Sequence, residues 1–201
     1  TAVNMNQNGG YLYLTNGADN IVRYDGSTTL LTYTSLATPG APSAAETGLG
    51  TGSAFAYYYK VARVNEIGFS IASPVNTGTV ASNLERTQWD ATTNYVTLTT
   101  PTASTGQIRW DIYLSTDNVD YFYLSSVTAV PAAAATWVDD GTAIPVPSTL
   151  APTGNTTQGP KVAELTNVGS RQFGVRDTDN RYRIWFTGAG TYAGAFSTAY
   201  D

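Results

Sequence analysis

Apolar and polar residues alternate with a period of two along most of the chain, which predicts β-strands rather than helices. Residues 11–24 read YLYLTNGADNIVRY, in which two alternating runs flank a polar turn. The turn contains an Asn-Gly step, whose residues tolerate the positive φ angles that tight hairpins require. We therefore expect a β-hairpin here, followed by a further strand at residues 29–33 after the Asp25-Gly26 turn.

A second segment near the other end of the chain repeats this hairpin. Residues 171–184 read RQFGVRDTDNRYRI, and a gapless alignment places Tyr13 on Phe173 and Asp19 on Asp179. Repeated units of this kind are typical of repetitive β-architectures. We therefore expect both ends of the chain to belong to one β-domain, with the residues between them folded as an insert. A further strand or a tail that pairs elsewhere is expected at residues 193–200.

Short β-rich runs separated by turn signals continue through the middle of the chain. Strands at this spacing, without helical periodicity, are typical of an all-β sandwich. A Pro-rich linker at residues 37–42 precedes them, and Pro145, Pro147 and Pro152 predict a second linker after them. The expected strands are Ala54–Asn65, Phe69–Ala72, Tyr95–Thr100, Gln107–Ser115, Tyr121–Thr128 and Thr136–Asp139.

One of these strands has no cleanly polar face. Tyr57, Tyr59 and Val61 alternate with Tyr58 and Lys60. Such a strand is expected to be covered on both sides or to lie in an interface, since a strand with one solvated face shows a polar alternate position.

The pattern divides the chain into three segments. Residues 1–37 are expected to form a β-hairpin segment of a flanking β-domain, and residues 38–150 a β-sandwich. Residues 151–201 should hold a linker and the second hairpin segment of the flanking domain. Because the middle segment has Pro-rich boundaries and strands that can pair among themselves, we expect it to fold alone. The chain begins at Thr1 rather than Met, so we expect it to be a piece of a longer protein.

Composition restricts the chemistry that the chain can perform. It has no His and no Cys, which excludes Ser-His-Asp and Cys-His catalysis, disulfides and Cys/His zinc sites within this chain. Charged residues make up 12% of the chain and its net charge is −5, so it is a poor partner for nucleic acid, whose affinity depends on cations. No apolar run is long enough for a membrane-spanning helix. Only carboxylate chemistry remains open to an enzyme.

Three acidic turns could be considered as metal sites. Asp177–Asn180 resembles the start of a calcium loop, but a full loop needs Gly at position six and Glu at position twelve. Those positions hold Tyr182 and Gly188. Hairpin turns with Asx hydrogen bonds are the favoured interpretation here and at Asp117–Asp120 and Asp139–Gly141. We therefore expect no metal, cofactor-binding or catalytic residue.

Arginines and aromatic residues are the other candidate binding groups. Four of the arginines lie close together near the second hairpin, where they could bind a carboxylate or phosphate or pair with neighbouring acids such as Asp177 and Asp179. Aromatic residues of the middle segment could stack on sugar rings, although strand aromatics are more often core or subunit interface. A two-carboxylate glycosidase is also open to a chain with 15 Asp and Glu. The arginines are Arg171, Arg176, Arg181 and Arg183, and the aromatic residues are Tyr57–Tyr59, Tyr121–Tyr123, Trp89, Trp110 and Trp137.

The middle segment resembles a fibronectin type III-like or immunoglobulin-like module of the kind found in bacteriophage structural proteins. The similarity begins at Ala41-Pro42-Ser43 and continues through the YYYKVARVNEIG stretch at residues 57–68 and Ser70–Ser73. It covers about half the chain. The remaining similar stretches are Tyr95–Thr99, Trp110–Ser115, Tyr121–Val127 and Trp137–Gly141.

The flanking segments are similar to blade fragments of β-propeller-type proteins of phage tails and related virion parts. This similarity lies in Tyr11–Gly26 and Arg171–Gly190. Together the resemblances imply a non-enzymatic structural component of a phage particle, in its tail, located in the virion. Its partners would be copies of itself and other virion proteins, and its immunoglobulin-like module would face outward for assembly or weak contact with host-surface glycans.

Two other functions are compatible with the sequence. The first is a carbohydrate-binding or adhesion module of a secreted or host-recognition protein. The second is a fragment of a polysaccharide-degrading enzyme. The structural role is preferred because the chain lacks the usual catalytic residue types and because a β-insert lies between the two repeated hairpins.

Overall fold

In the described part of the chain all regular structure is β, apart from one short 3-10 helix, η1 (Arg86–Gln88). The computed structural model describes residues 2–8, 10–27, 30–32, 35–50, 52–78, 80–169, 171–178, 181–187 and 197–198. The prediction of an all-β fold is confirmed. Among these residues, no helix has the length and apolar character needed to cross a membrane.

The chain divides into two compact units, which we call the flanking unit and the middle unit. The flanking unit comprises Thr1–Ser35, Glu66–Gly68 and Thr156–Asp201, and the middle unit comprises Leu36–Asn65 and Phe69–Asn155. The flanking unit is therefore built from both ends of the chain and from three residues that the sequence had assigned to the middle segment.

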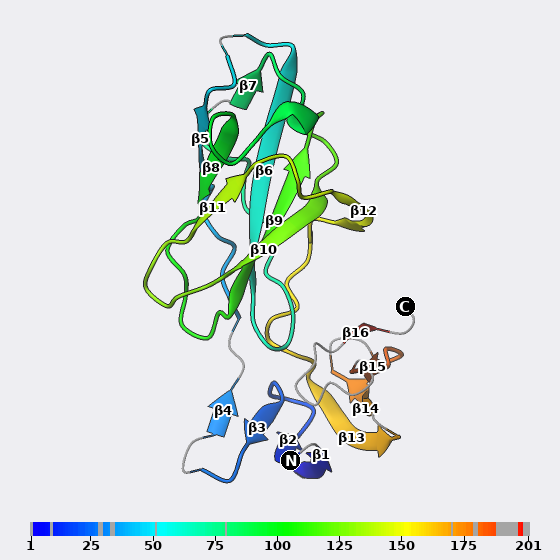
Figure 1. Cartoon of the computed structure of the whole chain (residues 1–201). Coiled ribbons are helices and arrows are strands. Elements are labelled where there is room, and N and C mark those ends of the chain that lie inside the picture. Colours follow the sequence, from blue (N-terminus) through cyan, green and yellow to red (C-terminus); the bar gives the residue numbers. More distant parts are fainter. Residues whose placement is uncertain are drawn as a thin grey trace. The chain divides into compact units, whose positions relative to one another are not determined.

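The flanking unit contains two four-stranded antiparallel sheets, and in each the strands lie side by side in chain order (Figure 1). The aligned repeats occupy equivalent places, because each begins with the second strand of its sheet. The first sheet consists of β1 (Asn4–Asn8), β2 (Tyr11–Thr15), β3 (Val22–Tyr24) and β4 (Leu30–Thr32), and the second of β13 (Val162–Val168), β14 (Arg171–Asp177), β15 (Trp185–Phe186) and β16 (Ser197–Thr198).

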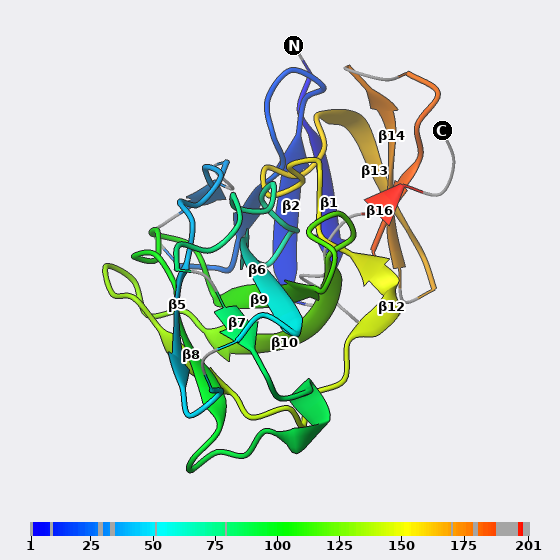
Figure 2. The ribbon, with the colours of Figure 1, turned by 90° about the horizontal axis from the view of Figure 1, so that it is seen from above.

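The two sheets of the flanking unit pack against one another, with β1 and β2 beside β13 and β14 (Figure 2). Tyr13 of the first sheet and Leu165 of the second share a buried cluster with Ile21, Ile67 and Val162. Polar contacts accompany this core: the Gly17 N–H donates to the Val162 carbonyl at 3.0 Å. Gly17 has φ +73°, and a Cβ there would lie 3.0 Å from the Cβ of Ala163, so this turn requires glycine.

The middle unit consists of a five-stranded and a three-stranded antiparallel sheet, in the orders β12-β10-β9-β6-β7 and β11-β8-β5. Strands that are distant in the chain are therefore neighbours in the sheet, as β6 and β9 are. The strands are β5 (Ser43–Thr47), β6 (Phe55–Val64), β7 (Val80–Ser82), β8 (Tyr95–Thr99), β9 (Arg109–Ser115), β10 (Phe122–Thr128), β11 (Thr136–Asp139) and β12 (Val146–Leu150).

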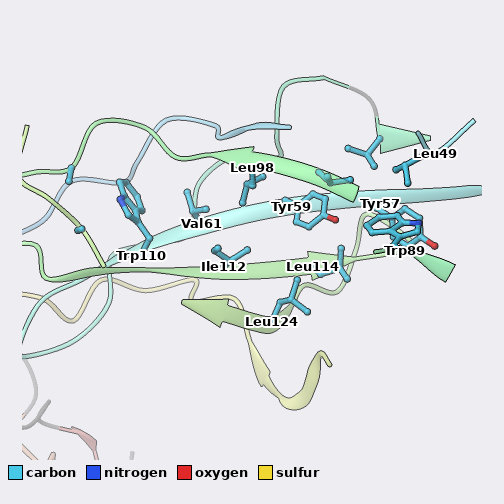
Figure 3. Packing of buried hydrophobic residues seen from close by; sticks show 14 residues of the cluster. Leu49, Tyr57, Tyr59, Val61, Trp89, Leu98, Trp110, Ile112, Leu114 and Leu124 are labelled. Carbon is cyan, nitrogen blue, oxygen red and sulfur yellow. The ribbon is translucent and has the colours of Figure 1, made fainter. Parts of the chain in front are cut away.

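The core of the middle unit lies between these two sheets. Leu98 of the three-stranded sheet shares a buried cluster with Tyr59, Val61, Trp110 and Ile112 of the five-stranded sheet, and all five are fully buried (Figure 3). Burying one such large apolar side chain contributes about 1.5–3 kcal/mol. This cluster is the largest group of buried apolar residues in the described part of the chain and gives the unit the character of a β-sandwich.

Some predicted elements differ from those observed. The strand expected at Phe69–Ala72 is not formed, and only an isolated bridge joins Val64 and Phe69. The linker predicted from Pro145 and Pro147 contains β12 instead. This strand lies at the edge of its sheet, where a proline does not interrupt a hydrogen-bonded ladder.

The second hairpin also departs from its predicted pattern. The repeat predicts that the second strand of this hairpin lies within residues 171–184, but β15 comprises only Trp185 and Phe186, and Tyr182 is 95% exposed. The predicted turn at Asp179-Asn180 lies outside the described residues. Of the strand expected at residues 193–200, Ser197 and Thr198 are described and form β16.

Candidate functional site

Most of the aromatic residues predicted as sugar-stacking candidates belong to the core. Tyr57, Tyr59, Trp89 and Trp110 are buried between the sheets of the middle unit, and Trp137 is partly buried against them. Their ring faces are occupied by protein, as in the edge-to-face pair of Tyr57 and Trp89, whose ring centroids are 4.8 Å apart. The preferred interpretation of these residues as core is confirmed.

A second group of aromatic residues lies on the opposite face of the five-stranded sheet. Because neighbouring residues of a strand point to opposite faces, Tyr58 and Lys60 of β6 lie on this outer face. Ala62, Tyr113 and Tyr121 form a buried cluster there, with Tyr58 and Tyr123 packed against it. The strand that lacks a polar face is therefore covered on both sides, as predicted.

A pocket of about 310 Å³ opens beside this cluster within the middle unit. The Nζ of Lys60 lies 4.1 Å from the ring centroid of Tyr121, which places a positive charge at the pocket wall. The pocket has the size and the mostly apolar lining of a small-ligand site. Its lining residues are Lys60, Ile71, Ala72, Val119, Asp120, Tyr121, Leu150, Ala151, Pro152 and Thr153.

An ion pair on the same sheet face has one buried and one exposed partner, since the Arg109 side chain is 45% exposed. Arg109 Nε donates to Asp111 Oδ1 at 2.8 Å, and Asp111 is only 2% exposed. Burial raises the pKa of Asp111, although the Arg109 guanidinium opposes this shift. Burial likewise raises the pKa of Tyr113 well above the usual value for tyrosine. These groups stabilise the sheet face and have no arrangement typical of an acid–base pair.

The acidic turns use their carboxylates for local hydrogen bonds. Asp117 Oδ1 accepts hydrogen bonds from the Ser115 hydroxyl at 2.8 Å and from the Val119 N–H at 2.9 Å. Asp177 Oδ2 accepts one from Trp185 Nε1 at 2.5 Å. Within the described ranges, no three Asp or Glu residues are placed to hold a metal ion. The turn interpretation of Asp117–Asp120 is confirmed, whereas Asp179-Asn180 of the other turn lie outside the described residues.

Asp139 accepts the predicted Asx hydrogen bond from the Gly141 N–H at 3.1 Å, and it is also part of a buried network that sequence reasoning missed. Its carboxylate, fully buried, accepts hydrogen bonds from Arg86 Nε at 2.9 Å and Arg86 Nη2 at 2.5 Å. The Tyr59 hydroxyl donates to the same carboxylate at 2.8 Å. Burial and the nearby carboxylate both raise the pKa of Tyr59 well above its ordinary value. Because Tyr59 and Asp139 come from different sheets, this network ties the sandwich together.

One sequence signal could have identified this network. Gly141 follows Asp139 by two residues, has φ +83°, and leaves only 2.0 Å between an added Cβ and the Arg86 carbonyl oxygen. An Asp-x-Gly step that closes a strand therefore marks a position where the backbone approaches another segment closely. The pairing with Arg86, which lies 53 residues earlier, follows only from the fold.

The arginine group of the second hairpin does not converge on one site. Arg176 pairs with Glu164 at 2.7 Å in an exposed ion pair, which contributes little to stability. Arg171 lies over the ring of Phe186 and Arg183 over that of Trp185. Arg176 and Arg181 line a polar pocket of about 330 Å³, whose lining includes Asp177. Asp177 was an expected partner of these arginines, but Arg176 pairs with Glu164.

No known protein family, curated protein or solved structure matches this chain.

Proposed function

We propose that the protein is a non-enzymatic structural component of a bacteriophage particle, in the tail. The flanking unit would build the assembly, and the middle unit would be an outward-facing immunoglobulin-like module. The observation that carries this proposal is the pair of four-stranded sheets with strands in chain order, one from each end of the chain. Four-stranded sheets of this kind are the blades of β-propellers.

The neighbour relations in the middle unit support the immunoglobulin-like part of this proposal. In such sandwiches strands A, B and E share one sheet, and strands G, F and C share the other, with C′ added beside C in variable-type domains. The order β5-β8-β11 corresponds to A-B-E, and the order β7-β6-β9-β10 corresponds to G-F-C-C′. All of these neighbouring pairs are antiparallel.

The chain order of the middle unit differs from that of an ordinary immunoglobulin-like domain. The hairpin at positions F and G, β6 and β7, comes before the strand at position B, β8, whereas it ordinarily ends the domain. The strands therefore have the same neighbours as in an immunoglobulin-like domain, although they follow one another along the chain in a different order. This arrangement suits an insert whose two ends return to one flanking unit.

Mass spectrometry of purified phage particles from a culture that expresses the gene would test the structural role. We expect peptides of this chain in particles that have been banded by density and treated with protease to remove adhering proteins. Electron microscopy with antibodies against residues 36–155 should label the tail. A chain that is found only in the medium or in the cell lysate, and never in particles, would refute this role.

Carbohydrate binding is the second candidate function, and the pocket beside Lys60 favours it. Ile71, Val119 and Leu150 expose apolar surface there, while Lys60 and Asp120 can exchange hydrogen bonds with sugar hydroxyls. Binding of the intact chain to an array of bacterial surface polysaccharides would test this function. Signal that is lost in Leu150→Asp but kept in a Val130→Asp control would support it, and release of reducing sugar would favour the enzyme alternative.

A further inference from the structure

The first sheet of the flanking unit carries apolar residues on both faces. Its inner face contributes Tyr13, whose ring lies in the buried cluster with Val162 and Leu165 of the second sheet. Cross-strand pairing places Met5 opposite Leu14 and Leu14 opposite Val22. Because these residues alternate with the inner ones along each strand, they lie on the outer face.

Two cross-strand rows on the outer face consist mostly of apolar residues. A second row runs through Gln7, Leu12, Tyr24 and Leu30. Met5 is 65% exposed and Leu30 is 53% exposed, and the apolar residues between them are only partly buried. None of the apolar members carries a charge. We call the six residues Met5, Leu12, Leu14, Val22, Tyr24 and Leu30 the outer apolar face.

The outer face of the second sheet has a different character. Its centre is aromatic, because Phe173 of β14 lies opposite Phe186 of β15 with ring centroids 6.3 Å apart. Charged residues surround this centre: Arg171 lies over Phe186, and Arg176 pairs with Glu164. The last two neutralise each other, so the charge that covering this face would have to accommodate is that of Arg171, which lies over the Phe186 ring.

We propose that the outer apolar face binds a second copy of this chain, through the outer face of that copy's second sheet. The contact continues the packing already present inside each chain, where the first sheet meets the second. If the same sheet-to-sheet contact also forms between copies, every sheet packs between two other sheets and both of its faces are covered. This inference rests on the proposed structural role and specifies how copies would assemble.

The geometry of the contact follows from the two different faces. Joining unlike faces gives a heterologous, head-to-tail interface, which closes into a ring when its rotation permits. Each copy supplies two four-stranded sheets. Two to four copies would therefore provide about four to eight sheets, the range found in closed β-propellers.

Substitution of the outer apolar face tests the proposal. Wild-type chain at high concentration is expected to have a mass that is a whole-number multiple of 21.3 kDa by light scattering. The variant Met5→Glu/Leu30→Glu should fall to the mass of one chain with unchanged circular dichroism, because both positions are exposed. Val130→Glu, 61% exposed on the middle unit, is the matched control and should still assemble. A monomeric wild-type chain would overturn the proposal.

Mixing variants tests the head-to-tail arrangement. Phe173→Glu should also be monomeric, and Thr166→Glu, an exposed neighbour in the same cross-strand row, serves if Phe173→Glu does not fold. Either of these variants keeps an intact outer apolar face, whereas Met5→Glu/Leu30→Glu keeps an intact outer face of the second sheet. An equimolar mixture of the two kinds of variant can therefore form one contact per pair of chains and should give dimers only. Assembly of Phe173→Glu and Thr166→Glu at the wild-type mass would overturn the proposal. Normal assembly of a chain that is absent from phage particles would contradict only the proposed role in the virion.

Discussion

The five-stranded sheet of the middle unit and the first sheet of the flanking unit both carry apolar side chains on two faces. In the middle unit one face packs on the three-stranded sheet, and the other is partly covered by the unit's own residues, so that Tyr113 and Tyr121 are 2% and 4% exposed. In the flanking unit only one face is covered, and Met5 on the other remains 65% exposed.

The two units differ in how much apolar surface they bury. The larger core of the middle unit includes three aromatic residues that are at most 5% exposed, Tyr57, Tyr59 and Trp110, whereas the flanking unit buries Tyr13 with four aliphatic residues. A sheet face that is apolar but uncovered is a site of association, since exposed apolar patches mark interaction surfaces. Stability of the middle unit should therefore depend on its own residues, and stability of the flanking unit on assembly.

The largest expected effect comes from the core of the middle unit. Trp110→Ala removes a fully buried ring and should destabilise this unit by about 3–5 kcal/mol. Hydrogen exchange measured by mass spectrometry should show faster exchange in β6, β9 and β10 and little change in β1 and β2. Trp137→Ala, which removes a partly buried ring, is the control and should cost less. Equal loss of protection in both units would show that they do not unfold separately.

The buried ion pair should give the next largest effect. Asp139→Asn leaves the Arg86 guanidinium in the interior without its counter-charge, and we expect a loss of about 3 kcal/mol in the free energy of unfolding. Chemical denaturation followed by fluorescence measures this loss. Asp120→Asn, at an exposed position, should change stability by less than about 0.5 kcal/mol. Similar values for the two variants would contradict the role assigned to the network.

High pH should destabilise the middle unit more than the flanking unit. Burial raises the pKa of Tyr57, Tyr59, Tyr113 and Tyr121 in the middle unit and that of Tyr13 in the flanking unit. Below the ordinary pKa of 10.0 these tyrosines are neutral in both the folded and the unfolded chain. Above it the unfolded chain loses their protons first, so that stability falls as pH rises. Melting curves from pH 9 upward should therefore show a steeper loss for the middle unit, and parallel losses would refute this assignment.

The smallest expected effect is that of divalent cations. The carboxylate of Asp117 already accepts hydrogen bonds from Ser115, Val119 and Asp120, so a metal ion would have to displace them. We expect EDTA and added calcium to leave the melting temperature of both units unchanged. A drop of several degrees in EDTA that calcium reverses would show that a metal site exists in the chain.

Where apolar and polar residues alternate regularly, this pattern predicted the positions of the strands. Thr136–Asp139 was predicted with its observed bounds, and β8 and β10 differ from their predicted ranges by one residue. Strands without this signal were missed. β1 reads NMNQN, and its asparagines instead bond to the second sheet, as Asn6 does to the Leu165 carbonyl. Such a strand is fixed by its neighbours and not by its own pattern.

The sequence alone thus determined the all-β class, the first hairpin and the lack of His and Cys chemistry, because these follow from local residue order and composition. Tertiary structure alone decided which strands are neighbours, that Arg86 meets Asp139, and that the aromatic residues divide between a core and an outer sheet face. It also decided that Met5 and Leu30 of the outer apolar face remain exposed. These features depend on contacts between residues far apart in the chain, and the apolar period of a strand specifies a buried face without specifying what covers it.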